Sequence, residues 1–269
     1  MSDPIFSLGT ESYHPYTLDE ALTGAGKAGF HYVELAAIPQ WSEHLSLDLD
    51  NDGIDNLKEK LDNYGLKVSG INANTGLMTE EGATLAKKAI SIASKLGANI
   101  VSNTIAGPEP RENIHQFMKH IGNVAEHAKC EGVLLGIEIH GEHTSNGELT
   151  KKIIEQVSHP HVKINYDTGN CVYFGDTWPY EDLEKCISEV AQVHLKDKIG
   201  GKGMWDFPPV GQGEVDFTRV FDILHTANYC GSMSVEIEYK NQLWPPVSEV
   251  DKGVAFAFEH TMALINSRQ

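Results

Sequence analysis

The amino-acid sequence predicts a parallel (β/α)₈ barrel, in which eight strands form a closed inner ring and helices form an outer ring. Short segments rich in β-branched residues alternate with longer segments whose apolar residues recur at helical spacing, and the alternation occurs eight times. The length of 269 residues, 41% of them hydrophobic, fits one such barrel better than two ordinary domains. We therefore expect a single TIM barrel domain over residues 1–269.

Each expected strand is a short apolar run, and an amphipathic segment follows it. The strands are expected at residues 6–12, 32–38, 67–74, 99–106, 133–141, 162–170, 191–197 and 233–239. The helices are expected to start at residue 17 and to span residues 54–64, 79–96, 112–130, 147–157, 180–187, 217–227 and 247–265. Thr17 and Glu20 have the spacing of a capping box. Glycines stand where left-handed helix C-caps belong, at positions 65, 97 and 132.

The net charge of −17 argues against binding to nucleic acid or to an anionic membrane, because both would repel the chain. No basic tract compensates for this charge, and no apolar run reaches the roughly 18 residues that a membrane span needs. The four cysteines form no C-x-x-C pair, and the first segment, MSDPIFSLGT, lacks the pattern of a signal peptide. We therefore expect a cytoplasmic protein.

Glycine motifs for dinucleotide or P-loop binding do not follow any expected strand. The glycine-rich segment GQGEVDF, residues 211–217, precedes a helix and has no strand before it. We expect this segment to shape the backbone of the seventh loop.

Four polar side chains stand near the C-terminal ends of four consecutive expected strands. They are Glu138, Asp167, His194 and Glu236, and each interrupts an otherwise apolar run. Active sites of such barrels lie at this end, and the burial of such groups needs a partner, which a cation supplies. Three carboxylates and one imidazole suit Mn²⁺ or Mg²⁺, with Co²⁺ or Zn²⁺ as alternatives, and we expect Mn²⁺ first.

Strand alternation leaves one ligand open, because Glu236 and Glu238 share a face of their strand. We favour Glu236, which lies deeper, and assign Glu238 a supporting role. For each of the four expected ligands, the alternative is a buried salt bridge. Four such residues together favour a metal site over that alternative. Polar residues of the earlier strands are expected to bond neighbouring loops or substrate hydroxyls, namely Glu34, Asn72, Asn74 and Asn103.

The segments GIEIHG, YDTGN, VHLKD, GQGEVDF and SVEIE resemble the xylose isomerase-like barrel superfamily, the sugar phosphate isomerase/epimerase group, in the same order along the chain. The resemblance implies metal ligands at Glu138, Asp167, His194 and Glu236, and a small carbohydrate as substrate. It leaves the reaction open, since the superfamily includes ketose epimerases, inosose and dehydroshikimate dehydratases, C-glycoside-cleaving lyases and endonuclease IV.

The chain departs from two of these groups. Ketose 3-epimerases have a histidine three residues after the metal aspartate and an arginine six residues after the metal histidine, where this chain has Asn170 and Gly200. The contacts that clamp the substrate should therefore differ, with Asn170 as a candidate contact. Endonuclease IV needs an Asp-x-His in the seventh loop, but the loop here reads MWDFP at residues 204–208, which argues against DNA repair.

Two histidines after the first ligand are candidate bases. The sequence Glu138-Ile139-His140 resembles the Glu-x-His of dehydroshikimate dehydratases, in which the histidine acts as base, and His143 lies just beyond it. His140 shares a strand face with Glu138 and should point into the same cavity. The alternative is a rim histidine that bonds a neighbouring carboxylate.

The leading hypothesis is a metal-dependent isomerase or epimerase of a keto sugar or polyol ketone, with Glu138 and Glu236 as bases on opposite sides of the substrate. The rival hypothesis is a lyase of the same superfamily, either a dehydratase or a C-glycoside-cleaving enzyme, with His140 or His143 as base. A sugar-binding barrel without activity is the third hypothesis.

Further side chains are expected to contact the substrate. Lys196 either bonds a substrate oxygen or forms a salt bridge with a neighbouring carboxylate ligand. Trp205 and Phe207 offer a wall for the apolar face of a sugar, and His14 in the first loop is a comparable candidate. No cluster of Arg and Lys marks a phosphate site, which favours a non-phosphorylated substrate. A homo-oligomer or an accessory subunit could complete the pocket.

Overall fold

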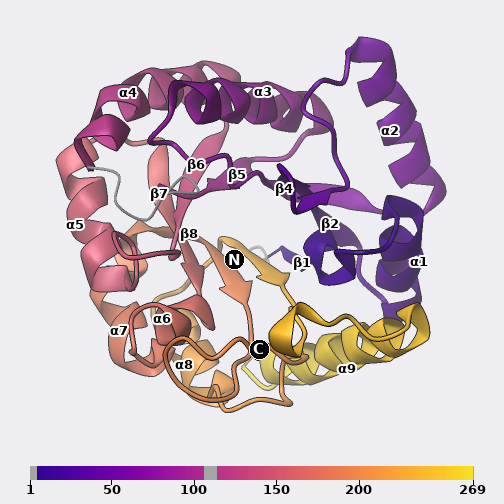
Figure 1. Ribbon diagram of the computed structural model, residues 1–269. Helices are drawn as coiled ribbons and strands as arrows, with labels where there is room; N and C mark the ends of the chain where they lie inside the picture. Colours follow the sequence, from indigo (N-terminus) through magenta and orange to yellow (C-terminus); the bar gives the residue numbers. More distant parts are fainter. Residues whose placement is uncertain (1–4, 106–113, 269) are drawn as a thin grey trace.

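Eight parallel strands close into a ring in the computed structural model, which describes residues 5–105 and 114–268 (Figure 1). The ring strands are β1 Phe6–Gly9, β2 Tyr32–Ile38, β4 Lys67–Asn72, β5 Ile100–Asn103, β6 Leu134–Glu138, β7 Val162–Asp167, β8 Val190–Leu195 and β9 Ser232–Val235. Strand β1 closes the ring because Leu8 lies beside Val33 of β2 on one side and Val235 of β9 on the other. The predicted (β/α)₈ barrel is thus confirmed.

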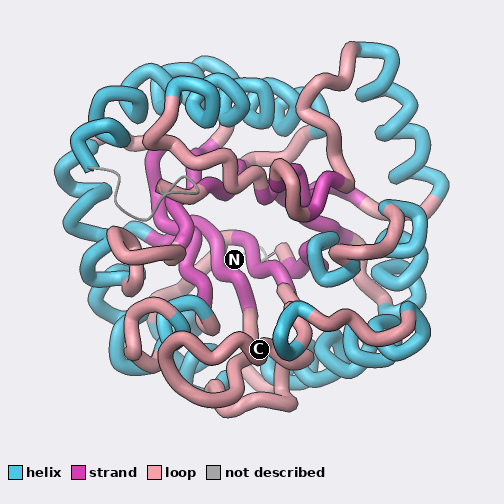
Figure 2. The backbone as a smooth tube through the Cα atoms, in the orientation of Figure 1, coloured by secondary structure: helices cyan, strands magenta, loops and turns pink. Residues whose placement is uncertain are grey.

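Helices surround this ring on all sides (Figure 2). They are α1 Leu18–Ala28, α2 Asn51–Asn63, α3 Glu80–Leu96, α4 Ile114–Glu131, α5 Gly147–Val157, α7 Pro179–Cys186, α8 Phe217–Thr226 and α9 Val247–Asn266, with the single turn α6 Asn170–Tyr173 and the 3₁₀ helices η1 Thr10–Tyr13, η2 Ile187–Glu189 and η3 Lys240–Gln242. The predicted helices agree closely with these bounds. The start of the predicted helix 112–130 and the end of the predicted strand 99–106 lie outside the described residues.

The predicted helix ends are confirmed. Thr17 and Glu20 form a capping box in which each side chain bonds the other residue's backbone N–H. Gly97 ends α3 in the left-handed conformation, with φ of 75°, and Gly65 and Gly132 have φ of 68° and 70°.

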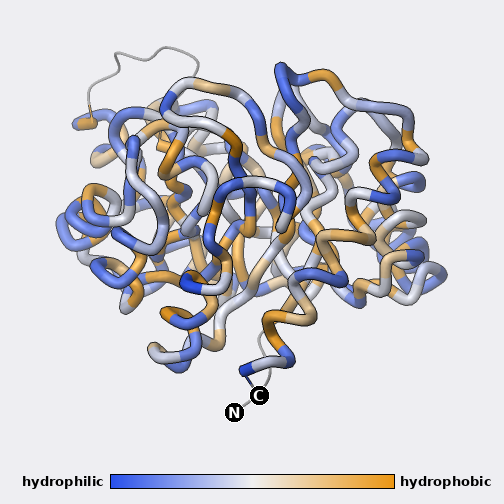
Figure 3. Tube along the Cα trace, turned by 90° about the horizontal axis from the view of Figure 1, so that it is seen from below, coloured by the Kyte–Doolittle hydropathy of each residue, from blue (hydrophilic) through white to orange (hydrophobic). Residues whose placement is uncertain are grey.

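Hydrophobic residues form the layer between strands and helices. Along the helices, hydrophilic and hydrophobic residues alternate, as expected of helices that bury one face (Figure 3). Strand residues that point out of the ring, such as Leu135, Ile137 and Val193, are fully buried in this layer. This core fixes the alternate strand residues so that they point into the barrel.

The barrel interior is polar, although branched apolar side chains usually fill this space. Gln192 Nε2 donates a hydrogen bond to Glu34 Oε1 at 2.8 Å, and Asn165 Nδ2 donates to Ser102 Oγ at 2.6 Å. All four of these side chains are fully buried. Gly136 leaves room for this network, since a Cβ there would lie 3.3 Å from the Cβ of Asn165. The interior is therefore a hydrogen-bonded platform beneath the barrel mouth.

The first predicted strand, residues 6–12, is too long, because β1 ends at Gly9. The chain then turns into η1, and Ser12 Oγ accepts a hydrogen bond from the backbone N–H of Ile237 at 3.0 Å. This bond ties the first loop to the chain that follows β9. It also turns Glu11 inward, where Asn72 Nδ2 donates to Glu11 Oε1 at 3.3 Å.

The sixth predicted strand, residues 162–170, ends three residues early at Asp167. The physical reason is a side-chain cap, since Asp167 Oδ1 accepts hydrogen bonds from the backbone N–H groups of Gly169 at 2.8 Å and Asn170 at 2.7 Å. The turn formed by these bonds precedes α6, which the sequence did not predict and whose N-cap residue is Gly169. The two-residue strand β3 Ser42–Glu43, antiparallel to β2, was also not predicted.

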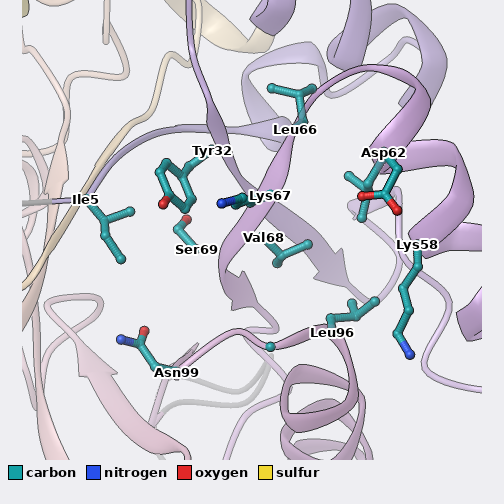
Figure 4. Close-up of a pocket in the computed structure, with 12 residues that line it drawn as sticks. Ile5, Tyr32, Lys58, Asp62, Leu66, Lys67, Val68, Ser69, Leu96 and Asn99 are labelled. Atoms are coloured by element: carbon teal, nitrogen blue, oxygen red, sulfur yellow. The ribbon is translucent and has the colours of Figure 1, made fainter.

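A cavity of about 430 Å³ lies at the amino-terminal ends of β2 and β4, where Tyr32, Lys67 and Asn99 are among its lining residues (Figure 4). This is the end of the barrel opposite the four candidate ligands. Among the described residues, no helix is both long and apolar enough to cross a membrane, and all four cysteines are free.

The buried carboxylate of Asp182 in α7 holds three elements together. It accepts hydrogen bonds from the backbone N–H of Gly147 at 2.5 Å and of Glu148 at 3.2 Å, and from the hydroxyl of Tyr166 at 3.1 Å. We predict that Asp182→Ala lowers the free energy of unfolding by about 2–4 kcal/mol, because buried donors lose their acceptor. Urea denaturation measures this change.

The exposed neighbour Glu181 provides the matched control, and Glu181→Ala should change the free energy of unfolding by less than about 0.5 kcal/mol. Equal effects of the two substitutions would contradict the proposed linking role of Asp182.

Candidate metal centre

The four residues predicted as metal ligands converge at the C-terminal end of the ring. Glu138 ends β6, Asp167 ends β7, His194 lies one residue before the end of β8, and Glu236 follows β9 directly. One ligand atom from each lies within 4.8 Å of the others, and all four residues are buried. Two metal–ligand bonds of about 2.0–2.2 Å span up to about 4.4 Å, so the four atoms are close to the spacing that one shared ion requires.

Each of the three carboxylates has one oxygen engaged by the protein and one left over. Asp167 Oδ1 accepts two backbone hydrogen bonds, Glu138 Oε1 accepts one from Asn170 Nδ2 at 3.4 Å, and Glu236 Oε1 accepts one from Lys196 Nζ at 2.6 Å. The second oxygens are all buried. Those of Glu138 and Asp167 have no hydrogen-bond partner in the described part of the chain, and that of Glu236 lies 2.8 Å from His194 Nδ1. Because unpaired buried carboxylate oxygens are costly, these residues fit a divalent cation.

The imidazole of His194 is oriented from below by a carboxylate on the other side of the barrel. Its Nε2 lies 3.0 Å from Glu34 Oε2, while Gln192 holds the other oxygen of Glu34. Its Nδ1 faces the candidate ligands, at 2.8 Å from Glu236 Oε2 and 3.5 Å from Glu138 Oε1. A histidine whose second nitrogen bonds a carboxylate is a common arrangement at metal sites. Nδ1 is therefore the nitrogen available to an ion.

Lys196 adopts the salt-bridge alternative considered for it. Its buried ammonium contacts Glu236 at 2.6 Å, Glu238 at 2.9 Å and Asp167 at 3.8 Å. Burial alone would lower the pKa of Lys196, but these carboxylates raise it well above its usual value. Lys196 is thus a fixed positive charge beside the centre.

The remaining carboxylates show how much negative charge the centre carries. Burial, followed by the charge of Glu236, raises the pKa of Asp167 and of Glu238, the latter to about 7. Burial and the charges of Glu236 and Glu34 also raise the pKa of Glu11. Glu11 is a site residue that the sequence analysis missed, although its place after the first strand could have indicated it.

The predicted histidine bases lie in the loop after β6. His140 packs against Phe174, with 4.7 Å between ring centroids, and its Nδ1 is buried without a hydrogen-bond partner among the described residues. Burial lowers the pKa of His140, so its imidazole is neutral at neutral pH. Thr144 fixes the backbone of His140, because its hydroxyl donates to the carbonyl of His140 at 2.8 Å. His143, three residues later, is half-buried.

The predicted aromatic contacts separate into two kinds. Phe207 is fully buried and lies under Lys196, with 4.6 Å from Nζ to the ring centroid, so it presents no surface to a ligand. Trp205 and His14 are partly exposed at the barrel mouth, where His14 stacks on Trp41 at 4.1 Å. Trp41, like Tyr173, Phe174 and Trp244, was missed because loop conformation decides its position.

The segment 211–217 shapes the seventh loop as predicted. Asp197, after β8, accepts hydrogen bonds from the backbone N–H groups of Gly211 at 2.8 Å, Gly213 at 2.7 Å and Val215 at 3.1 Å. A Cβ on Gly213 would lie 2.2 Å from Asp197 Oδ1, which explains the glycine there. This arrangement holds the loop that carries Trp205.

The model of the xylose isomerase-like TIM barrel family matches residues 23–260, so the chain belongs to that family. An L-ribulose 3-epimerase of Methylomonas sp. strain DH-1 is 22% identical over 237 residues, covering 81% of this chain and 77% of that protein. An L-ribulose-5-phosphate 3-epimerase of Escherichia coli strain SMS-3-5 is 25% identical over 252 residues, covering 87% and 86%.

Solved structures support the fold. A xylose isomerase-like TIM barrel protein from Mycobacterium smegmatis in complex with magnesium has a TM-score of 0.78, with 17% identity over 100% of this chain and 99% of that one. A D-psicose 3-epimerase from Clostridium cellulolyticum H10 has a TM-score of 0.75, with 15% identity over 97% and 99%. The relatives' names agree with the expected isomerase/epimerase class.

We predict that Glu34→Gln weakens Mn²⁺ binding about 10–100-fold, because the amide no longer holds the imidazole of His194 through a charged acceptor. Isothermal titration calorimetry of the metal-free protein measures this change. Glu43→Gln is the control. It alters an exposed carboxylate in β3, which pairs with β2, and it should leave the Mn²⁺ affinity unchanged. Equal affinities for the two variants would contradict the orienting role of Glu34.

We predict that the metal-free protein loses stability as the pH rises from 4.5 to above 7. The pKa of Glu238 is about 7 in the folded chain against a usual 4.5, so the folded state holds the extra proton in this window. The stabilisation is complete below pH 4.5, and up to roughly 3 kcal/mol disappears as Glu238 ionises. Thermal denaturation between pH 4.5 and 8 measures the slope.

Glu238→Gln should flatten this slope, since the amide does not titrate. An unchanged pH dependence in the variant would show that Glu238 does not cause it.

Proposed function

We propose that the protein is a divalent-metal-dependent isomerase or epimerase of keto sugars. The observation that carries the proposal is the group of buried carboxylate oxygens of Glu138, Asp167 and Glu236 near His194 Nδ1, two of which have no hydrogen-bond partner among the described residues. Family membership and the epimerase names of the relatives support the same reaction class. We take Mn²⁺ as the preferred ion, since a mainly oxygen donor set with one nitrogen suits it.

Glu138, Asp167, His194 and Glu236 would hold the ion. A bound divalent cation supplies positive charge at the substrate oxygen where negative charge develops when the neighbouring C–H loses its proton. Lys196 adds a second, fixed positive charge beside Glu236. The neutralised site can then accept an uncharged polyol.

Proton transfer in this proposal belongs to Glu138 and Glu236. They come from β6 and β9, three strands apart around the ring. Glu138 Oε2 has no donor among the described residues, and Glu236 Oε2 lies 2.8 Å from His194 Nδ1. A carboxylate on either side of a planar intermediate can remove a proton from one face and return it on the other. That exchange of faces inverts the carbon, which is an epimerisation.

A specific observation favours a lyase as the second candidate function. His140 is half-buried and neutral because burial lowers its pKa, and its buried Nδ1 has no hydrogen-bond partner among the described residues, which suits a general base. If His140 takes the proton and a group leaves from the next carbon, the reaction ends in elimination. Asn170 and His143 are then the polar neighbours we propose for substrate contact.

We predict that the Mn²⁺-loaded protein incorporates one solvent deuterium into a keto sugar such as L-ribulose in D₂O, because epimerisation returns a proton from solvent. Mass spectrometry and separation of the epimers measure the product. Loss of water or of a larger group would identify the lyase instead. Absence of exchange and loss across a panel of keto sugars would contradict both candidate reactions.

We predict that Asp167→Asn lowers Mn²⁺ affinity and reduces turnover at least about 100-fold, because the amide is a poor ligand for the ion. Metal analysis and the same deuterium assay measure both effects. Asp176→Asn, at an exposed position in the following loop, is the matched control and should behave as wild type. Full metal content in Asp167→Asn would show that Asp167 is not a metal ligand.

A further inference from the structure

Six partly exposed aromatic side chains surround the barrel mouth, and we call them the aromatic collar. They are His14, Trp41, Tyr173, Phe174, Trp205 and Trp244. They come from the loops after β1, β2, β7, β8 and β9, and they include three of the four tryptophans in the chain. A partly exposed aromatic surface that five loops form at this end of the barrel indicates a ligand-binding surface.

The collar is continuous. His14 lies between Trp41 and Trp244, with ring centroids 4.1 and 4.8 Å apart. Trp205 links Trp41 at 6.3 Å to Tyr173 at 5.6 Å, and Phe174 follows Tyr173 at 4.7 Å. Each ring packs against a neighbour and still keeps part of its surface open, which is the geometry that admits a further flat ring.

The collar adjoins the metal centre at two points. Trp205 packs against Phe207, with 5.3 Å between ring centroids. Phe207 lies under the ammonium of Lys196, and Lys196 contacts Glu236. On the other side, Phe174 packs on His140, two residues after Glu138. A ligand with one end at the centre therefore has its other end among the collar residues.

Two polar atoms in the collar lack partners. Trp205 Nε1 and His14 Nδ1 are buried and have no hydrogen-bond partner within the described ranges. A buried indole N–H normally finds an acceptor, so the ligand should bring an oxygen or a similar acceptor. The charged side chains of Asp206 and Lys240, near Trp205, already form a pair, with 3.4 Å between Lys240 Nζ and Asp206 Oδ2. The collar thus favours an uncharged ring with polar substituents over a phosphate group.

We propose that the collar binds a planar aromatic group carried by the substrate, so that a sugar portion lies at the metal centre and an aryl portion stacks near Trp41, Trp205 and Trp244. The placement of the sugar portion rests on the proposed function. A free ketopentose, or its phosphate, offers only one small C–H face, which covers a single ring and leaves most of the collar open. The substrate class is therefore an aryl-linked sugar.

Two probes that share one sugar and differ only in the attached group test this proposal. Phenyl β-D-glucopyranoside should bind the Mn²⁺-loaded protein at least about fivefold more tightly than methyl β-D-glucopyranoside, since aromatic stacking contributes up to about tenfold. Tryptophan fluorescence titration measures both affinities, and saturation-transfer NMR should show contacts to the phenyl protons. Equal affinities, or no binding of either probe, would overturn the proposal.

Substitutions test which residues cause the preference for the phenyl probe. Trp205→Leu and Trp41→Leu should each reduce the phenyl preference to about twofold or less, whereas Trp178→Leu, outside the collar at the start of α7, should retain it. Mn²⁺ affinity and thermal denaturation check that each variant is folded. A preference that survives both collar substitutions would overturn the proposal.

Deuterium exchange on a free keto sugar separates this proposal from the proposed function. Wild-type exchange without any phenyl preference would leave the epimerase in place and remove the aryl site. Phenyl preference without exchange on any keto sugar would support the aryl site and count against the epimerase.

Discussion

The concentration of buried negative charge at one end of the barrel is the constraint on which the rest of the site depends. The buried carboxylates there include those of Glu11, Glu34, Glu138, Asp167, Glu236 and Glu238. Against them stand the buried side chains of Lys196 and His194. Such an imbalance is tolerable only if protons, hydrogen bonds or a cation compensate for it, and the protein shows the first two and a site that fits the third. The raised pKa values, the backbone donors at Asp167 and the vacant oxygens are separate consequences of one electrostatic problem.

The polar interior of the barrel also helps to accommodate this buried charge. Hydrogen bonds run across the ring from Gln192 and His194 in β8 to Glu34 in β2, and from Asn165 in β7 to Ser102 in β5. These hydrogen bonds hold the charged side chains in position before any ligand binds, as a pre-organised site requires. An apolar filling would pack equally well but would leave His194 without a partner behind it.

The sequence was sufficient for the fold and for the four central residues, because both follow from regular rules. Strand alternation and the position at strand ends placed Glu138 and Asp167 in one cavity without any knowledge of loops. The same rules could not show that Glu34 lies beneath His194, since that contact depends on how far the ring closes. The collar was largely missed for another reason. Trp41 and Trp244 meet through loops whose course depends on individual hydrogen bonds, such as that from Trp244 Nε1 to the carbonyl of Ser12.

The order of the four central residues along the chain has a consequence for biosynthesis. They are spread from residue 138 to residue 236, while the carboxylate that orients the histidine stands at residue 34. In a chain emerging from the ribosome, the four residues therefore cannot meet until the segment that follows β9 has been made. Assembly of this four-residue cluster is therefore a late event of folding, and a product truncated before Glu236 lacks one of its four members.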